Sequence, residues 1–362
     1  SSGDWLYVSF AAGFINLWNP ELDLKSLVAE NEHYLSLLER ANVETGFLSG
    51  RTNHQKWLAY RGLTRERGSL SDGEYDEDAI LQRIVDIEYE SGVGIFHLNK
   101  MEICFTYELF EKARYHRMHG DASIQALAGS PYLVSWSLFS FLTDATLMDG
   151  NAVERRGALR RMRREFHRMK RWADHNPHNF LHLKLLMEAE LAKFRRRYFD
   201  AVNLYNRAIE SALDYRNLHH TALIYELAAR FHLRYGVNHA ARELLRSAYN
   251  HYRVWGATGK VSQLEEYYGG LLLEDEKAVL VAPSSRSSGS GSIAFESLTL
   301  IKASMAISSE IVLERLLDRL IQISLENAGA DRGIMFLVRG GSIFQVATGF
   351  ADRPTEMVDH QD

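Results

Sequence analysis

Cysteine is almost absent from this chain, which holds only Cys104 among its 362 residues. A single cysteine cannot form an internal disulfide, so we expect a reducing, cytoplasmic location. Long apolar runs are also missing. No stretch reaches the roughly 18 residues that a membrane-spanning helix needs, and no segment has the pattern of a secretory signal. The sequence therefore predicts a protein without a membrane span.

An excess of positive charge is lacking as well. The formal net charge is −5, which argues against a protein that binds nucleic acid over its whole surface. Hydrophobic residues make up 46% and charged residues 25% of the chain, as in ordinary globular proteins. We therefore expect folded domains with cores of their own.

Proline is scarce, with five in the chain. Three prolines follow a residue that can cap a helix, as Asn19-Pro20, Ser130-Pro131 and Asn176-Pro177, which is a favoured way to begin a helix. Pro283 instead opens the polar, glycine-rich segment PSSRSSGSGS. Residues 282–294 are therefore predicted to be a flexible linker.

Before this linker, apolar residues recur at helical intervals. The clearest sets are Leu22, Leu24, Leu27, Tyr34, Leu35 and Leu38, and then Ile80, Leu81, Ile84 and Ile87. No convincing alternating pattern of a strand occurs in residues 1–280. The expected fold class of residues 1–281 is therefore mainly α, an array of helices.

Two segments of this array repeat each other. Tyr198, Ala201, Tyr205 and Ala208 have the same spacing as Asn238, Ala241, Leu245 and Ala248, which lie 40 residues later. The pattern resembles the tetratricopeptide repeat, an antiparallel helix pair that stacks into a superhelix, although that repeat has about 34 residues. A weaker third copy is centred on Phe110 and Ala113. The alternative is an ordinary set of helical hairpins.

The pattern changes after the linker. Residues 298–323 keep a helical spacing of apolar residues. RGIMFLV and SIFQVATGF follow, separated by Gly340-Gly341, and have the composition and turn of a β-hairpin. Residues 295–362 are therefore predicted to be the start of an α+β domain.

Several stretches resemble one family. LIKASMAISSEIVLERLLDRLIQISLENAGADRGIMFLV is similar to the linker helix and first strand of a GAF domain. The similarity is to large signalling proteins with a protein-kinase-like domain, an AAA-type ATPase, a helical sensor array, a GAF domain and often a histidine kinase. MKRWADHNPHNFLHLKLLMEAELAKFRRRYFDAVNLYNRAIESA and YRVWGATGKVSQLEEYY resemble the helical array of those proteins. The resemblance implies that this chain, which does not begin with Met, is a middle segment of such a protein.

The same resemblance sets the functional expectation. It implies a non-catalytic sensor and scaffold, which binds a protein or peptide on its helical-repeat surface and relays the signal to GAF and kinase domains of a two-component system. The parent protein is expected to be a histidine or serine/threonine kinase with an ATPase domain. Residues 295–327 are expected to pair with a second copy as a homodimer. Residues 295–362 match about the first third of a GAF domain, so no GAF ligand residues are assigned.

The most unusual stretch is ERRGALRRMRREFHRMKRW, with nine Lys and Arg residues between positions 155 and 171. Leu159, Met162, Phe166 and Met169 recur on one helical face and predict a buried stripe, and Arg160, Arg164, Arg168 and Arg171 are expected on the opposite face. This ridge is the candidate binding site for an acidic partner or, alternatively, for nucleic-acid phosphates. The competing interpretation is a solvated face neutralised by acidic residues of neighbouring helices.

The stretch WGATGKVS resembles a phosphate-binding loop. A Walker A loop needs an earlier glycine and a hydroxyl residue directly after the lysine, and this chain has valine at both positions. We expect instead a helix that ends near Trp255, a turn at Gly256, and a new helix that is capped by Thr258 and buries Val261, Leu264, Tyr268 and Leu271.

No catalytic, cofactor-binding or metal-binding residue is expected elsewhere. His175, His178 and His182 lack the further ligands of a metal site and are interpreted as turn and surface residues, and the remaining histidines as structural. The acidic run SDGEYDEDA lacks the spacing of a calcium loop and is interpreted as a loop and helix start. Cys104 is expected to be a buried small residue.

Overall fold

The computed structural model describes residues 22–273, 321, 325, 330–339, 342–350 and 356–357. The chain forms two compact units, Ser1–Val281 and Ala282–Asp362. The predicted helix start at Asn19-Pro20 and the predicted linker 282–294 lie outside the described residues. So does the predicted dimer segment 295–327, apart from Ile321 and Leu325.

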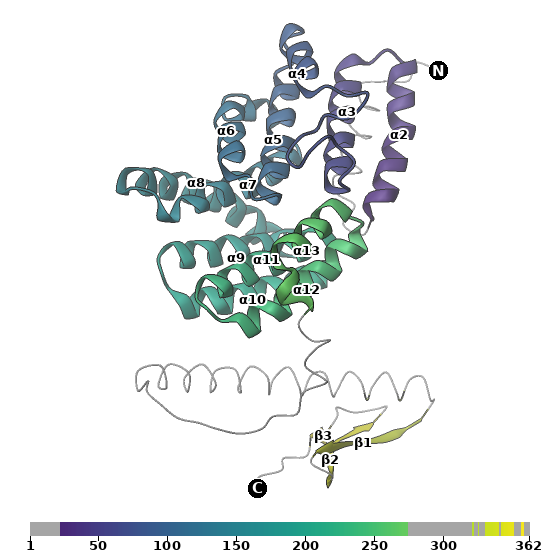
Figure 1. Cartoon of the computed structure of the whole chain (residues 1–362), viewed down its shortest axis with the longest axis vertical. Coiled ribbons are helices and arrows are strands. Elements are labelled where there is room, and N and C mark those ends of the chain that lie inside the picture. The colour runs from purple at the N-terminus through teal and green to yellow at the C-terminus, as the bar shows by residue number, and fades with distance from the viewer. Residues whose placement is uncertain are drawn as a thin grey trace. The chain divides into compact units, whose positions relative to one another are not determined.

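The first unit is helical throughout its described part (Figure 1). Its helices are α2 (Leu24–Arg40), α3 (Glu44–Tyr60), α4 (Glu77–Asp86), α5 (Glu90–Thr106), α6 (Phe110–Gly120), η1 (Ser123–Leu127), α7 (Tyr132–Ala145), η2 (Thr146–Asp149), α8 (Ala152–His175), α9 (Pro177–Phe194), α10 (Tyr198–Tyr215), α11 (Leu218–Arg234), α12 (Asn238–Trp255) and α13 (Thr258–Leu273). The mainly α fold class is therefore confirmed. Among the described residues, no helix combines the length and the apolar character needed to cross a membrane.

Five helix pairs are joined by three-residue connections of one geometry. The middle residues of these connections are Asn42, Glu88, Glu108, Arg196 and Gly236, and all have left-handed backbones with φ between 54° and 73°. The next residue donates its N–H five residues back, as Arg197 does to the carbonyl of Ala192 at 2.8 Å. This motif reverses the chain directly after a helix, so each pair of helices runs antiparallel.

Three of the positions that repeat in the sequence are buried in each copy of the repeat. α10 and α12 each have 18 residues and begin at the equivalent residues Tyr198 and Asn238. The equivalent buried positions are Ala201, Tyr205 and Ala208 in α10, Ala241, Leu245 and Ala248 in α12, and Ala113, Arg117 and Gly120 in α6. The weaker third copy therefore uses the same three positions, although α6 has only 11 residues. A tetratricopeptide-like superhelix stays a prediction.

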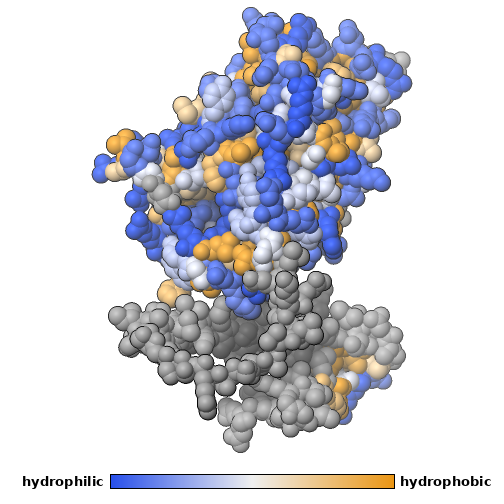
Figure 2. All heavy atoms as spheres, in the orientation of Figure 1, coloured by the Kyte–Doolittle hydropathy of each residue, from blue (hydrophilic) through white to orange (hydrophobic). Residues whose placement is uncertain are grey.

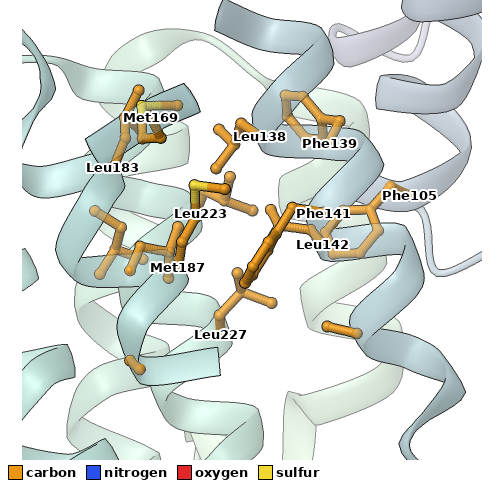
Figure 3. Close-up of a cluster of buried hydrophobic side chains, with 14 of the residues drawn as sticks. Phe105, Leu138, Phe139, Phe141, Leu142, Met169, Leu183, Met187, Leu223 and Leu227 are labelled. Carbon is orange, nitrogen blue, oxygen red and sulfur yellow. The ribbon is translucent and has the colours of Figure 1, made fainter. Parts of the chain in front are cut away.

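The interior of the array holds two groups of buried apolar side chains. The larger group extends from α5 to α11. In Figure 3, side chains of α7 such as Phe141 and Leu142 face Met187 of α9 and Leu227 of α11. Each fully buried side chain of this size contributes about 1.5–3 kcal/mol by leaving water. This group holds the middle helices together.

The second group joins the first helices of the array to the last. Leu24 of α2 and Trp57 of α3 belong to the same buried cluster as Trp255 of α12 and Leu264 of α13. The hydroxyl of Thr258 also donates to the backbone carbonyl of Arg61, at 2.7 Å. Leu27 of α2, Trp57 of α3 and Trp255 of α12 also line a cavity between these helices.

The two described cap predictions had different outcomes. Pro177 is the first residue of α9, and Asn176 accepts from the N–H of Asn179 at 3.3 Å, which confirms that cap. Ser130 does not cap α7. Its hydroxyl donates to the carbonyl of Leu127 at 2.7 Å because it closes the turn after η1, and Pro131 takes the cap position without a side-chain bond.

The described part of the second unit is a small sheet. β1 (Arg332–Arg339) pairs antiparallel with β2 (Ser342–Phe350), which confirms the predicted hairpin strands. β3 (Glu356–Met357) pairs with β2 along its other edge. Ile321 and Leu325 are helical and buried. The GAF-like assignment of residues 295–362 stays a prediction.

Candidate functional site

The arginine-rich stretch forms α8. Asn151 and Glu154 cap this helix reciprocally. Met162 and Met169 of the predicted apolar stripe are completely buried, and Leu159 and Phe166 are partly buried. The buried face also contains a residue that the prediction left out, the carboxylate of Glu165.

Two of the four arginines that we predicted on the free face are neutralised. Arg164 pairs with Glu165 at 2.8 Å and with Asp121 at 3.4 Å. Arg168 pairs with Glu165 at 2.7 Å and donates to the hydroxyl of Ser137. Both arginines lie at the edge of the buried face, because positions 164 and 168 are within one turn of Glu165. Glu165 of α8 itself therefore pairs with both arginines, and only Arg164 also has a partner from a neighbouring segment, Asp121.

The free face of α8 consists of a different set of arginines. Arg156, Arg160, Arg163 and Arg171 are exposed, and within the described part of the chain no carboxylate lies in ion-pair distance of them. We call these four residues the arginine stripe. Arg160 and Arg171 were predicted, and Arg156 and Arg163 replace Arg164 and Arg168. The stripe extends over about 22 Å, since a helix rises 1.5 Å per residue.

An ion pair between a partly exposed arginine and a buried carboxylate anchors α8 to α7. Arg161 makes two hydrogen bonds, at 2.6 and 2.8 Å, to Asp144, whose side chain is 1% exposed. These bonds raise the pKa of the Arg161 guanidinium. Sequence reasoning missed this pair. The available signal was Asp144 itself, a single carboxylate in the apolar helix YLVSWSLFSFLTDA, because a buried charge needs a partner.

A groove of about 670 Å³ lies between α6 and the start of α8. It is lined by three strongly exposed apolar side chains, Tyr115 (54%), Met118 (64%) and Val153 (78%), and also by Arg160 of the arginine stripe. Figure 2 shows that hydrophobic residues gather in separate areas on a largely hydrophilic face. Apolar and cationic groups therefore meet along one groove, whose wall also contains the carboxylates of Glu111, Asp144 and Glu154.

The stretch WGATGKVS forms the predicted helix–turn–helix. α12 ends at Trp255, Gly256 has a φ of 87°, and α13 follows. Thr258 is the first residue of α13 rather than its cap, and its hydroxyl bonds Arg61. Lys260 is completely buried and donates to Glu226, Gln263 and the carbonyl of Thr106, each at 2.7 Å. A lysine held in this way cannot reach a phosphate group.

The cavity at the centre of the array has a volume of about 90 Å³. Its deepest polar groups come from α3 and α5. Lys56 Nζ lies 3.3 Å from Glu102 Oε2, and Tyr60 donates its hydroxyl to Glu102 Oε1 at 3.1 Å. All three side chains are at most 5% exposed. The ion pair leaves this wall without net charge.

His219 of α11 completes the polar wall. Its ring stacks on Trp255 with centroids 4.4 Å apart, and its Nε2 lies 3.0 Å from the Tyr60 hydroxyl. Burial lowers the pKa of His219 to about 3, with a smaller contribution from Lys56, so the ring is neutral. Tyr60 donates its only proton to a carboxylate, which can only accept. His219 Nε2 must therefore carry the proton, and Nδ1 is an acceptor.

Four further histidines with lowered pKa values form two pairs. His182 was expected on the surface, but it is completely buried and shares a 2.9 Å hydrogen bond with His220. His97 and His116 lie 3.0 Å apart. Burial lowers the pKa of His97 to about 4 and of His116 and His220 to about 3. Within the described ranges, no three side chains form a group that could hold a metal ion.

Cys104 and the acidic run take structural positions. Cys104 is completely buried, as predicted, and burial raises the pKa of its thiol to about 11. Asp76 caps α4 by accepting from the N–H groups of Asp78 and Ala79, which confirms the predicted helix start. Glu77 instead turns inward and pairs with the buried Lys100 at 2.8 Å.

Comparisons of this chain with protein-family models, with curated proteins and with solved structures give no match.

Proposed function

We propose that this chain is a non-catalytic sensor and scaffold segment of a signalling protein, and that it binds an acidic protein partner on α6 and α8. The observation that carries the proposal is the arginine stripe beside the α6–α8 groove. Four exposed guanidinium groups lie on one face of α8 without carboxylate partners in the described chain, and one of them, Arg160, lines the groove with three exposed apolar side chains. The signalling context, with GAF and kinase domains in the parent protein, is supported by the sequence resemblance alone.

The partner that fits this surface is a segment with apolar and acidic residues on adjacent faces, such as an amphipathic helix. The apolar anchors Met118 and Val153 would supply most of the affinity. Exposed ion pairs contribute only about 0.2–1 kcal/mol each, but they set orientation and raise the association rate. Groove and stripe together therefore favour an acidic protein segment.

Nucleic acid is the second candidate occupant of the arginine stripe. Phosphates would use the guanidinium groups of the stripe but not the apolar side chains of the groove. The negative net charge of the chain also opposes nonspecific nucleic-acid binding. We therefore treat binding to nucleic acid as the outcome that would contradict the proposal.

The test measures binding of a fluorescent acidic amphipathic peptide and of duplex DNA by anisotropy. The variants are Arg160→Glu/Arg163→Glu in the stripe, Met118→Ala/Val153→Ala in the groove, and Arg207→Glu/Arg253→Glu as a matched reversal elsewhere on the exposed surface. We expect the first two variants to weaken peptide binding at least tenfold and the third to leave it unchanged. Peptide binding that is unchanged in the stripe variant would reject an acidic protein partner. DNA binding that is unchanged in the groove variant would reject it as well.

A further inference from the structure

The central cavity is a second site, independent of the arginine stripe. Its charges balance, because Lys56 pairs with Glu102 and His219 is neutral. A charged occupant would therefore bring an unpaired charge into a partly enclosed space, at a cost in desolvation. The charge balance favours an uncharged occupant.

The hydrogen-bonding groups of the wall are only partly used. Lys56 has three N–H donors and makes one hydrogen bond within the described chain, to Glu102. His219 has an acceptor at Nδ1, for which the described residues provide no partner, since Nε2 is committed to Tyr60. An occupant that satisfies both groups must accept from an ammonium and donate to an imidazole.

Size limits the occupant further. A volume of about 90 Å³ admits only a small group. Buried apolar side chains, among them Trp57, Leu138 and Phe139, form the rest of the wall. Val134, Ser135 and Asn217 also line the cavity and, like His219, are only partly buried, so the cavity opens to solvent on their side.

We propose that this cavity binds an uncharged primary amide, either a small free molecule or the side chain of an asparagine or glutamine. The carbonyl oxygen accepts from Lys56, and the amide N–H donates to His219. A carboxylate of the same shape lacks the donor and adds a negative charge. An alkylammonium lacks the acceptor and repels Lys56. The amide is the one of the three that matches the wall in both hydrogen bonding and charge.

The test compares three ligands of matched size, propionamide, propionate and propylammonium, by the chemical shifts of the tryptophan indole N–H groups in the full chain. We expect saturable shifts with propionamide in the millimolar range and binding at least tenfold weaker for the two ions. Equal or tighter binding of either ion would overturn the proposal.

Ser135→Phe, which places a ring at the half-exposed mouth, is expected to weaken propionamide binding at least tenfold. Ser36→Phe is the same change at an exposed position of α2 and is expected to have no effect. Lys56→Met is expected to abolish binding, and Ser135→Phe keeps the test valid if that variant fails to fold. Unchanged binding in Ser135→Phe would place the ligand elsewhere and reject the site.

One further ligand distinguishes a small free amide from the side chain of an asparagine or glutamine. N-acetyl-glutamine-N-methylamide carries the same side-chain amide on a peptide backbone. Binding tighter than that of propionamide identifies a polypeptide side chain as the occupant, and weaker binding identifies a free amide. Absence of binding by both compounds contradicts the proposal.

Discussion

The ammonium of Lys260 in α13 lies 2.7 Å from Oε1 of Glu226 in α11, and neither side chain has appreciable contact with solvent. Lys260 also bonds the carbonyl of Thr106 at the end of α5. α5, α11 and α13 therefore meet at the ammonium of Lys260. The lysine that makes WGATGKVS look like a nucleotide site instead joins the last described helix of the array to α5 and α11.

Replacement of Lys260 by methionine should destabilise the first unit. Loss of one member of a buried ion pair leaves an uncompensated charge and typically costs about 3–5 kcal/mol. Glu226 still accepts a hydrogen bond from Tyr252 and still pairs with Arg230. We therefore expect the free energy of unfolding, measured with urea, to fall by an amount near the lower end of that range. Addition of Glu226→Gln should recover part of the loss. A single variant within about 0.5 kcal/mol of the wild type would contradict a structural role.

Gly259 is required for close packing rather than for phosphate binding. A Cβ atom at this position would lie 2.5 Å from the Tyr107 hydroxyl and 2.6 Å from the backbone of Gly62. We expect Gly259→Ala to lower the unfolding free energy by about 1–3 kcal/mol through overpacking. Gly270→Ala is the control in the same helix, because no atom lies within 4 Å of its added Cβ. Thermal unfolding of the pair checks the difference, and equal melting temperatures would refute it.

Arg160 and Arg161 are adjacent in sequence but should differ in their effect on stability. Arg161→Ala removes both hydrogen bonds to the buried Asp144, whose remaining ion-pair partner is Arg117 at 3.6 Å. This change should lower the free energy of unfolding by about 2 kcal/mol. Arg160→Ala removes an exposed side chain without an ion pair and should change stability by less than about 0.5 kcal/mol. Chemical denaturation of the two variants measures the contrast. A larger loss for Arg160→Ala would show that the free face of α8 is wrongly assigned.

Two histidines with strongly lowered pKa values, His219 and His220, should make stability depend on pH. The pKa values of His219 and His220 in the folded state are about 3, below the ordinary value of 6.5, so the unfolded state binds protons first as the pH falls. Their contribution is complete above pH 6.5 and is lost progressively between pH 6.5 and about 3. Urea titrations at pH 7, 5.5 and 4.5 should show this decline. His219→Gln should flatten it, whereas the exposed control His239→Gln should not.

The fold was predicted best where the signal is local. Helical spacing located α2, and Gly256 marked the turn between α12 and α13. The other helix connections were not predicted as a repeated motif. Only Gly236 among the five carries the expected glycine, whereas Glu108 and Arg196 hold the same left-handed conformation with a side chain. Residues other than glycine disfavour the left-handed conformation, so the packing of each helix pair must impose it at these positions.

The candidate sites depended more on tertiary structure. The composition of α8 indicated a cationic face, but the choice between Arg163 and Arg164 depended on Glu165 and on Asp121 of a neighbouring segment. The central cavity was missed altogether. Tyr60 and His219, which share its main hydrogen bond, are 159 residues apart, and neither belongs to a recognisable motif.

The sequence alone therefore determined the helices, their repeated burial pattern and the positive charge of α8, because each of these follows from residues within a few turns of one another. Tertiary structure decided which arginines remain free, why Lys260 is buried and where an uncharged ligand finds donors. Those properties arise where helices distant in sequence pack together, since the burial and partners of a charged group are set by its neighbours in space.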